Sequence, residues 1–167
     1  VQHARARGAR VYAYVAGSGI TTDAFHIAAP DPSGEQQTAA MTKALADADL
    51  SPTDVVHINA HATSTPVGDM IEAAAIVAAL GEDSAALVSA TKSMTGHTLG
   101  AAGAIESIFT ILAMRDRLAP PTINVDHPEP DLAIDLVRNT PRALPTGQIA
   151  ALNNSFGFGG HNVALAF

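Results

Sequence analysis

The sequence predicts an α/β fold in which a mostly parallel sheet is packed between helices. Short apolar segments rich in valine and isoleucine alternate with longer segments whose apolar residues recur at helical spacing. Polar stretches follow three strand-like segments directly, at 61–69, 91–103 and 153–161. Ligands of such sheets bind at the carboxyl ends of the strands, so we expect all three stretches to contribute to one site.

The amino-terminal third contains a predicted strand at 11–17, a loop at 21–34 and a helix at 34–48. Two valines and two tyrosines favour the strand, which Gly17 and Gly19 end or bulge. Ser33, with Gln36 three residues later, predicts a capping box at the start of the helix. The apolar face of this helix comprises Ala39, Ala40, Met41, Ala44, Leu45 and Ala48.

The central elements are a turn at 51–54, a buried strand at 55–60, a helix at 69–80, a short strand at 87–90 and a helix at 98–117. Asp69 and Glu72 have the spacing of a capping box, and Gly81 ends their helix. The apolar face of the last helix comprises Leu99, Ala102, Ile105, Phe109 and Leu112. A loop-rich region with an edge strand at 134–137 precedes two closing strands at 149–152 and 163–167.

The composition excludes several classes of protein. The chain has 167 residues, of which 47% are hydrophobic and 15% charged, as expected for one well-buried domain. A net charge of −7 argues against a nucleic-acid surface, which must neutralise phosphates. No apolar run reaches the ~20 residues of a membrane helix, and no signal peptide is visible, so we expect a cytoplasmic protein without membrane contact. The polar start at Val1 suggests a helix cut in its middle, and hence a fragment.

Cysteine is absent from the chain, which therefore has neither a disulfide framework nor a cysteine nucleophile. The histidines lack the close spacing of a zinc site, so we expect no metal. The glycines near Lys92 follow the lysine, whereas in a phosphate-binding P-loop they precede it. No Gly-x-Ser-x-Gly motif is present, which argues against a serine hydrolase. His57 lies within a strand and is expected to be a core or interface residue.

The candidate chemistry lies in the three polar stretches. The first carries His61, the second Lys92 and His97, and the third two phenylalanines in a glycine-rich turn. Two histidines from separate strand ends can hold one developing oxyanion when their tautomers are suitable. Asp69 and Glu72 could compensate the charge of Lys92, because an unpaired buried charge is costly. The competing interpretation is that the glycines form a packing face and the acids only cap a helix.

These stretches resemble the β-ketoacyl-(acyl carrier protein) synthases, condensing enzymes of the thiolase superfamily. The segments NAHATSTPVGD at 59–69, KSMTGHTLGAAG at 92–103 and NSFGFGG at 154–160 are similar to three motifs of that family, in the family's order. The resemblance extends over the chain from Val11 onward. It is greatest to the elongating synthases of type II fatty-acid synthesis, with polyketide ketosynthases as an alternative.

The resemblance implies a role for each motif residue. His61 and His97 would complete a Cys-His-His triad and stabilise the enolate formed when a malonyl thioester loses carbon dioxide. Lys92 would set the electrostatics through Glu72, and Asp69 would support the neighbouring loop. The remaining positions would contact the substrate: Thr63 and Thr65 through the phosphopantetheine arm, and Phe156, Gly157 and Phe158 as the gate of the acyl pocket.

The missing cysteine is the main departure from the family pattern. In the family it lies in the first half of a duplicated fold, so residues 1–167 are expected to be a carboxyl-terminal thiolase-like half that is inactive alone. The resemblance implies acyl carrier protein, the missing half and a second subunit of a homodimer as partners, and no cofactor apart from the carried phosphopantetheine. The rival hypothesis is a non-catalytic ketosynthase partner that resembles a chain-length factor.

Overall fold

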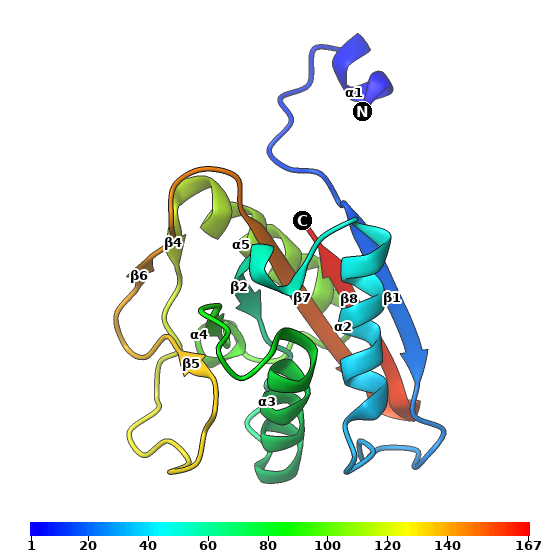
Figure 1. Cartoon of the computed structure of the whole chain (residues 1–167), viewed down its shortest axis with the longest axis vertical. Helices are drawn as coiled ribbons and strands as arrows, with labels where there is room; N and C mark the ends of the chain where they lie inside the picture. The colour runs from blue at the N-terminus through cyan, green and yellow to red at the C-terminus, as the bar shows by residue number, and fades with distance from the viewer.

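The computed structural model describes residues 1–167 and contains a six-stranded sheet with helices on both faces (Figure 1). The helices are α1 (Gln2–Ala6), α2 (Glu35–Asp47), α3 (Pro66–Leu80), α4 (Lys92–Thr95) and α5 (Ala102–Asp116). The strands of the large sheet are β1 (Gly17–Thr22), β2 (Val55–Asn59), β3 (Leu87–Ser89), β5 (Asp135–Leu136), β7 (Ala150–Gly157) and β8 (His161–Ala166). A separate pair consists of β4 (Leu118–Ala119) and β6 (Arg142–Ala143), and the 3-10 turns are η1 (Pro52–Asp54), η2 (Leu99–Ala101) and η3 (Phe158–Gly160).

The large sheet has the order β1-β8-β7-β2-β3-β5 and is mostly parallel, as predicted. β7, β2, β3 and β5 pair in parallel, and only β8 runs against its neighbours. Helices α2 and α3 cover one face and α5 covers the other (Figure 1). The carboxyl ends of β2, β3 and β7 therefore lie at one edge, and each leads into or carries one of the three polar stretches.

The face under α2 and α3 is an apolar core. The predicted face of α2 is buried at Ala40, Met41, Ala44 and Leu45, which pack with Ile58, Ile76, Val88 and Leu152 of the neighbouring elements. The edge strand near 134–137 and the closing hairpin are also confirmed, although β7 continues through Asn153 to Gly157. No helix has the length and apolar character needed to cross a membrane.

The predicted strand at 11–17 is wrong, because β1 begins where that strand was expected to end. Tyr12, Tyr14 and Val15 lie in an extended arm and are at least half exposed. α2 packs directly on the glycine backbone of β1: a Cβ atom on Gly19 would lie 1.8 Å from the carbonyl oxygen of Ala40. The arm does not form a strand despite its high β-propensity, because that propensity reflects packing against adjacent strands and the arm has none beside it.

The helix starts also differ from their predictions. Gly34, with φ of 65°, is the N-cap of α2, and Ser33 accepts the backbone N–H of Glu35 without forming the expected capping box. α3 begins at Pro66, three residues before Asp69, because proline is well suited to the first helical position. The helix expected at 98–117 is divided into η2 and α5.

The buried face of α5 combines two alanines with Glu106 and Thr110, and Ala102 is the one residue of the predicted apolar face that is buried. Ala102, Glu106, Thr110 and Ala113 face the sheet, whereas Leu99 is 74% exposed and Ile105, Phe109 and Leu112 are half-buried. The reason is that the strands present polar side chains on the face of the sheet that α5 covers. We call the polar layer the set formed by His57, Asn59, Ser89 and Asn153 of the sheet with Glu106, Ser107 and Thr110 of α5.

Hydrogen bonds connect the two sides of the polar layer. Asn153 Nδ2 donates to the carbonyl oxygen of Gly103 at 3.2 Å and to Ser107 Oγ at 3.1 Å. Asn59 Nδ2 donates to the Glu106 carbonyl oxygen at 3.4 Å, and its Oδ1 accepts the hydroxyl of Thr91 at 3.1 Å. These directional hydrogen bonds fix the position of α5 relative to the strand ends, whereas apolar contacts alone would let the helix shift more easily along the sheet.

His57 is a fully buried core residue in this layer. Ser89 Oγ donates to the carbonyl oxygen of Pro120 at 2.7 Å, so it accepts the Nε2–H of His57 at 3.1 Å. The other ring nitrogen, Nδ1, is buried without a hydrogen-bond partner. Burial lowers the pKa of His57 to about 4, because a proton on Nδ1 would create a charge without water or an acceptor.

We predict that His57 makes the fold sensitive to acid. In the unfolded chain His57 binds a proton near pH 6.5, whereas in the folded protein it does so only near pH 4. The stability associated with neutral His57 is therefore fully present above pH 6.5 and is lost as the pH falls toward 4. The free energy of unfolding should decrease by about 2 kcal/mol between pH 7 and pH 5 through this residue. Urea unfolding of His57→Leu should show a weaker pH dependence than the wild type, whereas His127→Gln, at an exposed site, should not. Equal pH dependence in all three proteins would contradict this role.

Candidate active site

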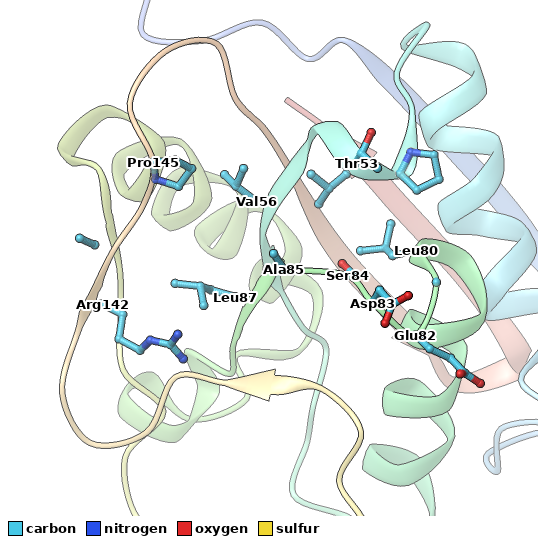
Figure 2. A pocket seen from close by; sticks show the side chains of 14 residues that line it. Thr53, Val56, Leu80, Glu82, Asp83, Ser84, Ala85, Leu87, Arg142 and Pro145 are labelled. Carbon is cyan, nitrogen blue, oxygen red and sulfur yellow. The ribbon is translucent and has the colours of Figure 1, made fainter.

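A cavity of about 1000 Å³ lies at the edge formed by the carboxyl ends of the strands. Its lining includes His61, His97 and Phe156, one residue from each of the three polar stretches. A second hollow lies at the opposite edge, where β2 and β3 begin, and Figure 2 shows that it is surrounded by side chains such as Val56, Leu87 and Arg142. The second hollow contains none of the motif residues, so we place the candidate site in the first cavity.

The two predicted histidines lie side by side in the first cavity. His61 follows β2 and His97 follows α4, and their ring centroids are 5.5 Å apart with the planes nearly perpendicular. The ring of Phe156, from β7, packs 6.1 Å from that of His61. Residues distant in sequence are thus brought together because β7, β2 and β3 are adjacent parallel strands.

Both rings can present hydrogen-bond donors to a ligand. His97 Nδ1 accepts the backbone N–H of Leu99 at 3.2 Å, so a neutral His97 carries its proton on Nε2. Burial, with smaller contributions from Lys92 and His97, lowers the pKa of His61 to about 3. His61 is therefore neutral at pH 7 and has one N–H. Two imidazole N–H donors can stabilise an oxygen that acquires negative charge during a reaction.

Glu72 anchors the backbone of the loop that carries His61. Its carboxylate accepts the N–H groups of His61 at 2.8 Å and Ala62 at 2.7 Å, and also Asn154 Nδ2 at 3.2 Å. Burial raises the pKa of Glu72, and the N–H donors oppose that shift by stabilising the carboxylate. The carboxylate thus holds a loop in which Ala62 and Ser64 adopt positive φ.

Asp69 supports the same loop from the first turn of α3. Its Oδ1 accepts the backbone N–H of Thr65 at 3.2 Å, while burial raises the pKa of Asp69. The capping box expected between Asp69 and Glu72 is therefore wrong, because both carboxylates bind the loop that precedes the helix. Thr63 and Thr65, whose hydroxyl oxygens are 3.4 Å apart, line the cavity beside them.

The glycine-rich turn forms another wall of the cavity. Phe156 and Gly157 line it from the end of β7, and Phe158 is 79% exposed in the turn that follows. The N–H of Gly159 donates to the carbonyl oxygen of Ile27 at 2.8 Å, and the N–H of Asp23 donates to that of Gly160 at 2.8 Å. The turn is therefore connected to the loop after β1.

The family described as "Beta-ketoacyl synthase, C-terminal domain" matches residues 12–126, which include both histidines and Lys92. The chain belongs to this β-ketoacyl synthase family. It is 52% identical over 166 residues to the "3-oxoacyl-[acyl-carrier-protein] synthase 2" of Mycobacterium tuberculosis (strain ATCC 25618 / H37Rv). That alignment covers 99% of this chain and 39% of the relative, so the chain spans about two fifths of the relative's length.

Solved ketosynthases share the fold of this β-ketoacyl synthase domain. The ishigamide ketosynthase/chain length factor superposes with a TM-score of 0.91 at 37% identity, over 99% of this chain and 40% of the other. The same values describe the match to a complex of a type II polyketide synthase acyl-carrier protein with its ketosynthase, bound to the hexaketide. The predicted thiolase-like fold and the resemblance to condensing enzymes are thus confirmed.

In this β-ketoacyl synthase domain the direct ion-pair partner of Lys92 is Glu106 and not Glu72, although the charge of Lys92 still acts to lower the pKa of Glu72. Lys92 Nζ lies 2.6 Å from Glu106 Oε1, and both side chains are almost fully buried, whereas Glu72 binds the backbone of the 61–65 loop. Burial raises the pKa of Glu106, and the hydrogen bond from Lys92 opposes this. Sequence reasoning missed Glu106, although a lone glutamate within an apolar helix is a signal for a buried charged partner.

We predict strong energetic coupling between Lys92 and Glu106. Removing one partner leaves an uncompensated buried charge, so Lys92→Met or Glu106→Leu should each cost about 3–5 kcal/mol in the free energy of unfolding. A double-mutant cycle measured by urea unfolding should give a coupling of about 2 kcal/mol. The matched cycle of Lys92→Met with Glu72→Gln should give less than about 0.5 kcal/mol. A larger coupling of Lys92 to Glu72 than to Glu106 would contradict this prediction and support Glu72 as the partner of Lys92.

Proposed function

We propose that this chain is the carboxyl-terminal half of a β-ketoacyl-(acyl carrier protein) synthase that elongates fatty acids. The reaction is the decarboxylative condensation of a malonyl thioester with an acyl group bound to the enzyme. The observation that carries the proposal is the pair of imidazoles, His61 and His97, whose rings lie 5.5 Å apart in one cavity. A second support is the 52% identity to a 3-oxoacyl-[acyl-carrier-protein] synthase 2.

The two histidines would act on the malonyl thioester. Breaking its bond to the carboxylate carbon releases carbon dioxide, and the electron pair moves into the thioester to form an enolate. The enolate oxygen becomes negative, and N–H donors from His61 and His97 stabilise it more than the starting carbonyl. The enolate carbon then attacks the acyl thioester, forms the new carbon–carbon bond and releases the enzyme's thiolate.

The remaining residues would position these reactants. Glu72 and Asp69 hold the loop that carries His61, and the Lys92–Glu106 pair fixes α4 against α5. Thr63 and Thr65 would donate hydrogen bonds to the phosphopantetheine arm of acyl carrier protein. Phe156 and Phe158 would gate the acyl pocket, because Gly157 and Gly159 permit the backbone rotation that such a gate needs.

The nucleophile would come from an amino-terminal half, because the chain contains no cysteine. The half-exposed apolar side chains of α5 need a cover, which is consistent with packing against that half and with a homodimer. Neither a metal nor a resident cofactor is needed for the proposed reaction, whose substrates arrive on phosphopantetheine.

Two related functions are weaker alternatives. A polyketide ketosynthase would use the same residues, but the 52% identity to a 3-oxoacyl-[acyl-carrier-protein] synthase 2 favours fatty-acid elongation. A non-catalytic chain-length factor would need no oxyanion site. The retention of His61, His97 and Lys92 around one cavity therefore favours the catalytic function.

We predict that His97→Ala in the enzyme comprising both halves lowers the rate of malonyl decarboxylation by about 10²–10³-fold. The reason is that the variant loses one of the two donors to the enolate oxygen. Release of carbon dioxide from a malonyl thioester measures the effect directly. The control is His127→Ala, at an exposed position outside the cavity, which should retain the wild-type rate. Full decarboxylation by His97→Ala would contradict the proposed function.

A further inference from the structure

Gln37 is a buried polar residue that the proposed mechanism does not use. It lies in the first turns of α2 and is only 3% exposed, and its Oε1 is buried without a hydrogen-bond partner. Gln37 nevertheless lines the same cavity as His61 and His97. An unpaired buried amide costs stability unless something binds it, so this residue calls for an explanation.

The packing places Gln37 on the side of the cavity formed by α2 and α3. Met41, one turn later on α2, contacts Asn154 Nδ2, which in turn donates to Glu72 behind His61. Gly34, one turn before Gln37, packs beside Ile71 of α3. Gln37 thus lies one turn from Met41, which contacts the asparagine behind the histidine loop, and it lines the cavity from helix α2.

The charges around the cavity restrict what can bind there. Three acidic residues line it, Asp23, Asp69 and Glu72, and no lysine or arginine does. Lys92 is paired with Glu106. An anionic group near Gln37 would therefore be repelled, whereas a neutral hydroxyl or amide N–H could donate a hydrogen bond to the unpaired Oε1 of Gln37.

We propose that Gln37 is a specificity-determining residue that hydrogen-bonds a neutral polar group of the thioester substrate. This inference rests on the proposed function. The donor has two possible sources, a hydroxyl of the acyl chain or an amide N–H of the pantetheine arm. In either case the enzyme discriminates against the analogue that lacks the donor, because Oε1 of Gln37 then stays buried and unpaired.

The test uses Gln37→Met, which keeps the length of the side chain and removes its amide, in the enzyme comprising both halves. Gln36→Met is the matched control, because this neighbouring glutamine is half-buried and does not line the cavity. Met should fold at least as well as the unpaired amide, which thermal unfolding can confirm. Gln37→Leu replaces it if Gln37→Met does not fold.

The measurement is kcat/KM for condensation with three substrates. One comparison is a 3-hydroxyacyl against a saturated acyl pantetheine thioester of equal length, and the other is a saturated acyl pantetheine against a saturated acyl N-acetylcysteamine thioester. The substitution should reduce the preference for the more polar substrate about fivefold in one comparison, as expected for one hydrogen bond. A change in the first ratio identifies the acyl hydroxyl, and a change in the second identifies the arm amide.

Three results would overturn the inference. If neither ratio changes in Gln37→Met, or if Gln36→Met changes the ratio equally, Gln37 does not read the substrate, although the proposed function stands as long as the wild type condenses. If the wild type condenses none of the three substrates, the proposed function and the inference both fail. The two failures are thus distinguishable.

Discussion

The buried ion pair between Lys92 and Glu106 is the contact on which the arrangement of the site depends. Lys92 begins α4, directly after the edge where β3 ends, and Glu106 lies in the polar layer beneath α5. Neither charge is tolerable without the other in a buried position, so the pair fixes α4 against α5. His97 follows α4 by two residues, and its position opposite His61 therefore depends on a contact that involves neither histidine.

Much of the fold could be predicted because hydrophobic runs and turn residues are local signals. β2, β3 and the closing hairpin came from β-branched runs, and the parallel order followed from their alternation with helices. The predictions failed where tertiary contacts override propensity. β1 is glycine-rich because α2 packs on its backbone, as the close approach at Gly19 shows, and no property of isolated residues indicates that contact. The buried face of α5 was predicted only at Ala102, because its sheet partners, such as Asn59 and Asn153, are polar.

The motifs of the candidate site could be predicted from the sequence, but the contacts between their side chains could not. His61 and His97 were recognised as residues after parallel strands, which topology then brings together. The partner of Lys92 could not be identified from spacing, because Glu72 and Glu106 are both acids on nearby helices and only the three-dimensional packing separates them. Gln37 was missed for a related reason: a glutamine on a helix is unremarkable until its burial without a partner is seen.

We propose that the histidines at the strand edge complete a site whose nucleophile lies outside residues 1–167. Mass spectrometry of the protein comprising both halves, after incubation with an acyl thioester, tests this proposal most directly. We expect one covalent acyl group, located by peptide mapping on a cysteine upstream of Val1. An acyl group within residues 1–167, or no adduct at all, would contradict it.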